Sequence, residues 1–112
     1  MLQFEELRLR LEGMQPEIKE LAGSIGLAQL ERESAELDAQ AAAPGFWDDM
    51  DKAQKISQHA AIVKSKIDGY HTLCADYDDA LTLIELADEA EDLSVLEECT
   101  EAVDKIRHAI DK

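Results

Sequence analysis

A run of apolar residues between Ala53 and Ile84 constrains the fold of this chain more than any other feature. Ten of them follow one another at alternating steps of three and four residues: Ala53, Ile56, Ala60, Val63, Ile67, Tyr70, Cys74, Tyr77, Leu81 and Ile84. This spacing is typical of a helix packed lengthwise against other helices. A helix from about Asp49 to Glu89 would be roughly 60 Å long at ~1.5 Å per residue. The rest of the chain must therefore cover its apolar stripe, which we call the seam.

A second series of apolar residues predicts an N-terminal helix over residues 2–22. Its members are Phe4, Leu7, Leu11, Met14, Ile18 and Leu21. Pro16 lies inside it, and a proline in a helix interior costs ~3 kcal/mol because it removes a hydrogen-bond donor. The helix either kinks there or stops near Gly13 and restarts with Pro16 in its first turn. The unbroken spacing favours a kink, and we expect this helix to be the weakest of the set.

Glycines mark the start and the end of the next helix. The spacing of apolar residues slips beside Gly23 and Gly26, which predicts a separate helix from roughly Leu27 to Ala42. Pro44 and Gly45 end it, and Asp48 or Asp49 is a good N-cap for the long helix.

Two further local signals lie at the ends of the long helix. Phe46 and Trp47 are expected to fill the corner before it, whereas an exposed Trp47 would instead indicate a binding hot spot. Ser94 and Glu97 form a capping-box pattern, which predicts a last helix of about Val95 to Asp111. With so short a connection, that helix folds back antiparallel along the C-terminal half of the long helix.

These signals predict an all-α fold: an elongated antiparallel helical bundle with coiled-coil-like packing around one long central helix. The 112 residues are expected to form a single domain over residues 1–112. Aromatic residues make up only 4% of the chain, which argues against a β-sandwich. We expect a monomer, and the heptad spacing leaves a dimeric coiled coil open.

The chain is strongly acidic, with a formal net charge of −15. Such a charge repels phosphate backbones, so no direct nucleic-acid binding is expected. Between Lys66 and Lys105 there is no lysine or arginine, whereas thirteen acidic residues lie there. The candidate partner-binding residues are the acids where the last two helices meet: Glu85, Asp88, Glu89, Glu91 and Asp92. A basic protein is their natural partner, and the alternative is a plain solvated end of the hairpin.

Signals for catalysis, metals and membranes are scarce. His71 and Cys74 lie one turn apart, but Cys74 falls on the seam and convergent ligands from other helices are missing. There is no glycine-rich phosphate loop, nucleophile elbow or H-E-x-x-H motif. We therefore expect no enzyme activity, no catalytic or metal-binding residues and no cofactor. With no signal peptide or membrane-spanning stretch, and two cysteines on apolar stripes, a soluble cytosolic protein is expected.

The order of these signals resembles the N-terminal domain of bacterial class I peptide chain release factors, of the release factor 2 type. The most specific piece runs from Pro44 through Phe46, Trp47 and Asp49 to the Lys-Ala-Gln stretch that begins at Lys52. Phe4-Glu5-Glu6-Leu7, Gly23-Ser24 and Leu37-Asp38 also match, so the resemblance covers essentially the whole chain.

The resemblance implies a helical module that acts in translation termination at stop codons, in the cytoplasm. The family's domain reaches toward the GTPase-associated region of the ribosome. It implies a basic ribosomal protein, and possibly another termination factor, as partners. The family's codon-reading Ser-Pro-Phe and catalytic Gly-Gly-Gln motifs are absent, so we expect a non-catalytic fragment of a release factor. A free-standing acidic coiled-coil adaptor or structural protein, and an acidic mimic of nucleic acid, remain as alternatives.

Overall fold

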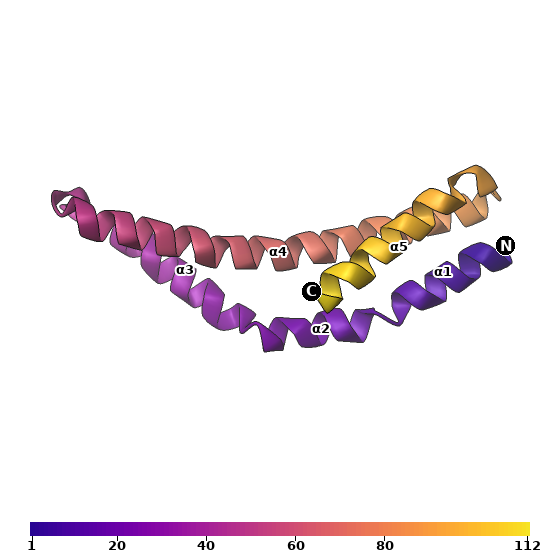
Figure 1. Cartoon of the computed structure of the whole chain (residues 1–112), viewed down its shortest axis with the longest axis horizontal. Coiled ribbons are helices and arrows are strands. Elements are labelled where there is room, and N and C mark those ends of the chain that lie inside the picture. The colour runs from indigo at the N-terminus through magenta and orange to yellow at the C-terminus, as the bar shows by residue number, and fades with distance from the viewer. The chain divides into compact units, whose positions relative to one another are not determined.

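The computed structural model describes all residues from Met1 to Lys112. It contains five α-helices, two short 3-10 helices and no strand, which confirms the all-α prediction (Figure 1). The helices are α1 (Leu2–Glu12), α2 (Gln15–Ser24), α3 (Leu27–Ala41), η1 (Phe46–Asp48), α4 (Met50–Glu89), η2 (Leu93–Val95) and α5 (Leu96–Asp111).

The long helix predicted from the seam is α4, which has 40 residues. Its start is fixed by Asp49, whose Oδ1 accepts a hydrogen bond from the backbone N–H of Lys52 at 3.1 Å. A carboxylate in this position satisfies one of the free N–H groups of the first turn. All ten seam residues are buried or half-buried, so the predicted helix and its phase are both confirmed.

The chain forms two compact units, and α4 contributes to both. The first unit consists of residues 1–21 and 71–112, and the second of residues 22–70. The expectation of a single domain over residues 1–112 stays a prediction.

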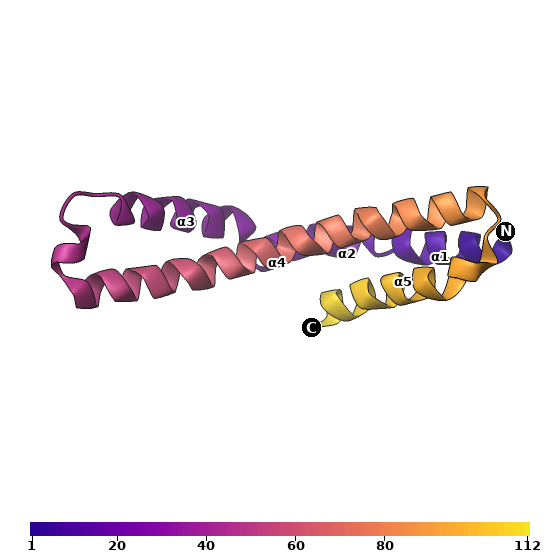
Figure 2. The same cartoon turned by 90° about the horizontal axis from the view of Figure 1, so that it is seen from above.

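The first unit holds most of the buried core. The α1 helix packs against α5, and α5 folds back along the last turns of α4 (Figures 1 and 2). The buried side chains come from every α-helix of the unit and the turn between α1 and α2: Phe4, Leu7, Leu11, Met14, Ile18, Leu73, Tyr77, Ala80, Ile84, Ala87, Cys99, Val103 and Ile106. Because two helices cover α4 here, its buried stripe is wider than the seam alone and includes Leu73, Ala80 and Ala87.

The N-terminal segment breaks into two helices rather than kinking. The α1 helix ends at Glu12, and α2 begins at Gln15, which places Pro16 in the first turn of α2. A proline there loses nothing, because the first N–H groups of a helix have no intrahelical partner. The favoured kink is therefore wrong. The apolar spacing survives because the backbone N–H of Met14 still bonds to the carbonyl of Leu11, at 2.9 Å, across a very short turn.

Burial argues against the expectation that this N-terminal helix is the weakest of the set, which stays a prediction. Phe4 and Leu11 are fully buried, and Met14 and Ile18 on either side of Pro16 are nearly so. The loss of helix continuity is offset by contacts with the core of the first unit.

The second unit is a hairpin of α3 and the first turns of α4, lying side by side in Figure 2. Gly26 before α3 has φ +68° and Gly45 before η1 has φ +78°, values that favour glycine. At Gly45 a Cβ would also lie 2.9 Å from the carboxylate of Asp48. The hairpin buries only Leu37, Ala53 and Val63.

The aromatic pair between α3 and α4 does not fill the corner between them. The rings of Phe46 and Trp47 contact each other edge to face, with centroids 5.2 Å apart. Phe46 is half-buried, but Trp47 is 61% exposed. The prediction of a buried Trp47 is wrong, because a tight 3-10 turn at η1 leaves only one of two consecutive side chains facing the helices.

The last helix begins one residue later than expected and with a different cap. Asp92, not Ser94, supplies the capping carboxylate: its Oδ1 accepts hydrogen bonds from the N–H of Ser94 at 3.0 Å and from the Ser94 hydroxyl at 2.5 Å. These bonds close η2, and α5 then starts without a side-chain cap at Val95. The Ser94–Glu97 capping box is therefore not formed.

Candidate partner-binding surface

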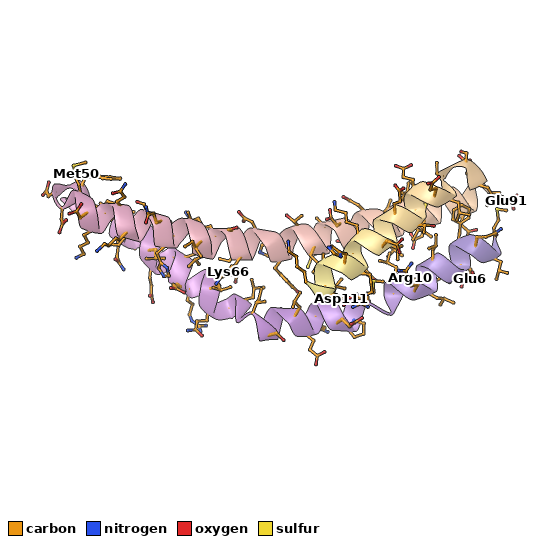
Figure 3. All side chains as sticks on the ribbon, in the orientation of Figure 1. Glu6, Arg10, Met50, Lys66, Glu91 and Asp111 are labelled. Carbon is orange, nitrogen blue, oxygen red and sulfur yellow. The ribbon has the colours of Figure 1, made fainter.

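The five candidate residues lie together where α4 turns into α5, in the first unit. We call Glu85, Asp88, Glu89, Glu91 and Asp92 the acidic turn. Glu91 is labelled at this end of the unit in Figure 3. Asp88 is half-buried, and the other four are exposed. The structure thus brings all the predicted residues to one end of the helical hairpin.

The backbone of the acidic turn is fixed by a Schellman motif at the end of α4. The N–H of Glu91 bonds to the carbonyl of Asp88, and the N–H of Asp92 bonds to the carbonyl of Ala87, both at 3.0 Å. These bonds satisfy two of the carbonyls that a helix end leaves free. The motif requires a left-handed residue, and Glu91 takes this conformation with φ +52°. It is the one non-glycine residue of the chain with a positive φ.

Asp92 combines a local structural role with its exposed position. The hydrogen bonds from the side chain and backbone of Ser94 lower the pKa of the Asp92 carboxyl, because they stabilise its charged form. Asp92 is therefore held in one orientation as a carboxylate, and its remaining acceptor positions face solvent.

Asp88 is already engaged within the first unit. Its Oδ1 pairs with the amino group of Met1, and its side chain is 35% exposed. None of the other four carboxylates of the acidic turn forms an ion pair. The groups that remain for a partner are therefore those of Glu85, Glu89, Glu91 and Asp92.

Negative charge is concentrated in the first unit as a whole. It contains six basic and eighteen acidic residues, for a formal charge of −12, whereas the second unit contains five and eight, for a formal charge of −3. Arginines of α1 and α5 form ion pairs with acidic residues outside the acidic turn. Arg10 pairs with Asp104 at 2.7 Å, and Arg107 forms two 2.8 Å hydrogen bonds to Glu17.

The Arg107–Glu17 pair joins α5 to the first turn of α2. The hydrogen bonds that Arg107 donates lower the pKa of the Glu17 carboxyl, and the acceptance of such bonds by Glu17 and Asp111 raises the pKa of the guanidinium. Bidentate pairing of this kind is geometrically specific. It holds the two helix ends together and engages the guanidinium away from the acidic turn.

Two exposed leucines beside the acidic turn were missed by the sequence analysis. Leu86 is 60% exposed and Leu93 is 45% exposed. Both are visible in the sequence as apolar residues that fall outside the seam within an otherwise acidic stretch. They give this surface an apolar component in addition to its charge.

Two further titratable groups have pKa values that are shifted by burial in the core. Burial raises the pKa of the Tyr77 hydroxyl and of the Cys99 thiol, because desolvation penalises their charged forms. Cys74 and Cys99 are both free. No three histidine, cysteine or acidic side chains converge as a metal site. None of the helices combines the length and apolar character needed to cross a bilayer.

Residues 30–112 match the PCRF domain family, and the chain belongs to that family. The match begins within α3 and includes all of α4, the acidic turn and α5. The family expected from the sequence is thereby confirmed.

The relatives of the chain are named peptide chain release factor 2. The protein from Clostridium perfringens is 40% identical over 88 residues, which cover 79% of this chain and 24% of the relative. That from Exiguobacterium is 28% identical over 110 residues, or 98% of this chain and 30% of the relative. That from Staphylococcus epidermidis is 30% identical over 111 residues, or 99% and 30%. The chain thus spans less than a third of their length. No solved structure gives a significant match.

Proposed function

We propose that this chain is the helical module of a peptide chain release factor, and that it contacts the ribosome during translation termination without contributing catalytic groups. The observation that carries this proposal is the match of residues 30–112 to the PCRF domain family, together with relatives named peptide chain release factor 2. A factor of this kind works on ribosomes in the cytoplasm.

Within this function, the acidic turn faces a basic protein of the ribosomal GTPase-associated region. Four of its carboxylates are exposed and have no ion-pair partner, and the Schellman motif and the Asp92 cap hold their backbone in one conformation. A preorganised acidic surface accelerates encounter with a basic partner through long-range attraction. Leu86 and Leu93 supply apolar contact at short range.

Charge reversal in a full-length release factor carrying this chain tests the proposal. The variant combines Glu85→Lys, Glu89→Lys and Glu91→Lys, and it leaves Asp88 in place because that residue pairs with the Met1 amino group. We expect association with ribosomal termination complexes, followed by stopped-flow fluorescence, to slow by about tenfold at low salt. The difference should shrink as salt screens the charges over about 10 Å. Peptide release by factor that is already bound should be unchanged.

A matched control carries the same charge change elsewhere. Glu36→Lys, Asp68→Lys and Glu101→Lys alter three exposed acids that lie outside the acidic turn. The control should associate at close to the normal rate. If both triple variants slow association equally, net charge and not the acidic turn is responsible. An unchanged rate for the first variant would leave the acidic turn as a solvated surface.

A further inference from the structure

The first half of α4 carries a stripe of basic residues that the proposed function does not use. Residues 52–67 contain four lysines and one histidine but no acidic residue, in a chain whose formal charge is −15. Five of these residues follow the three-four spacing of a helix face. We call Lys52, Lys55, His59, Ile62 and Lys66 the basic stripe. It lies entirely in the second unit.

The basic stripe runs parallel to the seam and is open to solvent. It extends about 21 Å along α4 at ~1.5 Å per residue. All five residues are exposed, and Lys66 is labelled on α4 in Figure 3. The side chains of Lys52, Lys55 and Lys66 form no ion pair. Ile62, in the middle of the stripe, is 57% exposed.

The α3 helix forms ion pairs with α4 on both sides of the seam but does not cover the basic stripe. Glu33 of α3 pairs with His59 at 2.5 Å, and Asp38 of α3 pairs with Lys64 at 2.8 Å. Lys64 lies on the other side of the seam, five residues from His59. The carboxylates of α3 thus reach α4 on both flanks, and three lysines of the basic stripe form no ion pair with them.

Three residues of the basic stripe occupy a heptad position that is buried in the other half of α4, where a second helix packs against it. Lys52, His59 and Lys66 are seven residues apart, and the same spacing continues through Leu73, Ala80 and Ala87. Those three are buried, with exposures of 6%, 3% and 5%, in the unit where both α1 and α5 contribute to the core. In the second unit α3 is the one long helix beside α4, and Lys52, His59 and Lys66 at the same heptad position are exposed.

We propose that the basic stripe binds an acidic amphipathic helix of a partner protein. Lysines that flank a helical seam select a neighbouring helix with carboxylates at the facing positions. Such a helix would cover Ile62 and the half-exposed seam residues, as α1 and α5 cover the seam in the first unit. A nucleic acid is the less fitting partner, because the exposed apolar side chain of Ile62 adds nothing to the binding of a phosphate backbone.

A synthetic peptide serves as the probe for this interaction. It is a labelled helix of about 20 residues, or roughly 30 Å, with leucines on one face and glutamates on both flanks. Binding to the chain is followed by fluorescence anisotropy at low salt. We expect Lys52→Glu, Lys55→Glu and Lys66→Glu together to weaken binding at least tenfold. The control of equal charge, Lys19→Glu, Lys105→Glu and Lys112→Glu, should keep binding within about twofold, since these residues lie in the other unit.

A second variant separates a protein partner from an RNA. Ile62→Ser leaves every charge in place and should weaken peptide binding several-fold, whereas binding of an RNA hairpin would not depend on Ile62. Circular dichroism checks that each variant folds, and Lys→Gln substitutions at the same three positions replace the Lys→Glu set if it does not. Insensitivity of peptide binding to the basic-stripe variants would overturn the proposal. The proposal would also be overturned if the RNA hairpin bound more tightly than the peptide and its binding were unchanged by Ile62→Ser.

The proposal stands apart from that for the acidic turn. The two surfaces lie in different units and attract partners of opposite charge, so either can fail without the other.

Discussion

At the scale of single residues, Glu91 has a strained backbone conformation in the acidic turn. The Schellman motif requires a left-handed residue there, and glutamate takes that conformation with φ +52°. For a residue with a Cβ, this costs roughly 1–2 kcal/mol, whereas glycine adopts it freely. We therefore expect Glu91→Gly to raise the free energy of unfolding by about 1 kcal/mol, measured by urea denaturation.

The control for this prediction is Glu89→Gly, two residues earlier. Glu89 is the last residue of α4 and has right-handed helical geometry, so glycine there should destabilise by ~0.5–1 kcal/mol. Opposite signs at the two positions would confirm the strain at Glu91. If Glu91→Gly lowers stability as well, the left-handed conformation is not what limits this turn.

At the scale of elements, the two halves of α4 differ in how deeply they bury the same seam. Ile84 is 1% exposed between α1 and α5, whereas Ile67 is half-exposed beside α3. Ile84→Ala should destabilise by ~2–5 kcal/mol, the usual range for truncating a buried isoleucine. Ile67→Ala should cost only about 1 kcal/mol, because part of its side chain is already exposed to water. Urea unfolding of both variants tests this.

The smaller cost expected for Ile67→Ala differs from what the seam alone suggests, because the seam places Ile67 near the middle of the buried stripe. Equal destabilisation by the two variants would show that Ile67 is covered in solution, for example by a second copy of the chain. The unfolding midpoint should then depend on protein concentration, because association stabilises by mass action. A midpoint independent of concentration, with unequal costs, supports the hairpin as described.

At the scale of the whole molecule, stability is distributed unequally between the two units. Thirteen of the sixteen buried residues belong to the first unit and only three to the second. Local opening requires less free energy where fewer apolar contacts must be broken. We expect backbone amides in α3 to exchange with deuterium at least about tenfold faster than those in the middle of α1, since tenfold corresponds to only about 1.4 kcal/mol.

Hydrogen exchange, measured by NMR or mass spectrometry, distinguishes this expectation of faster exchange in α3 from the one based on Gly13 and Pro16, which is that the N-terminal helix is the weakest. If helix breakers decide local stability, α1 should exchange fastest. Burial of Phe4, Leu7 and Leu11 argues for the opposite order. Similar exchange in α1 and α3 would mean that the second unit is stabilised by contacts beyond its three buried residues.

The sequence by itself determined the all-α fold, the position of α4 and the grouping of the acidic residues at its end. Apolar spacing located α4 to within a residue at its start, because a stripe that must be buried fixes the phase of a helix. The gap in basic residues between Lys66 and Lys105 located the acidic turn, since charge patterns do not depend on packing. The pieces around Pro44, Phe46 and Lys52 indicated the family that the PCRF match confirms.

Only the tertiary structure decided how each signal was used. Whether Pro16 kinks or starts a helix depends on whether the core can hold Met14 and Ile18 across a break. Whether Trp47 is buried depends on the turn at η1, and the choice of Asp92 over Ser94 as a cap depends on the Schellman motif before it. Burial along the seam depends on how many helices lie beside α4. The spacing along one helix shows which apolar residues must be buried. The number of helices that bury them is set by contacts between segments far apart in the chain.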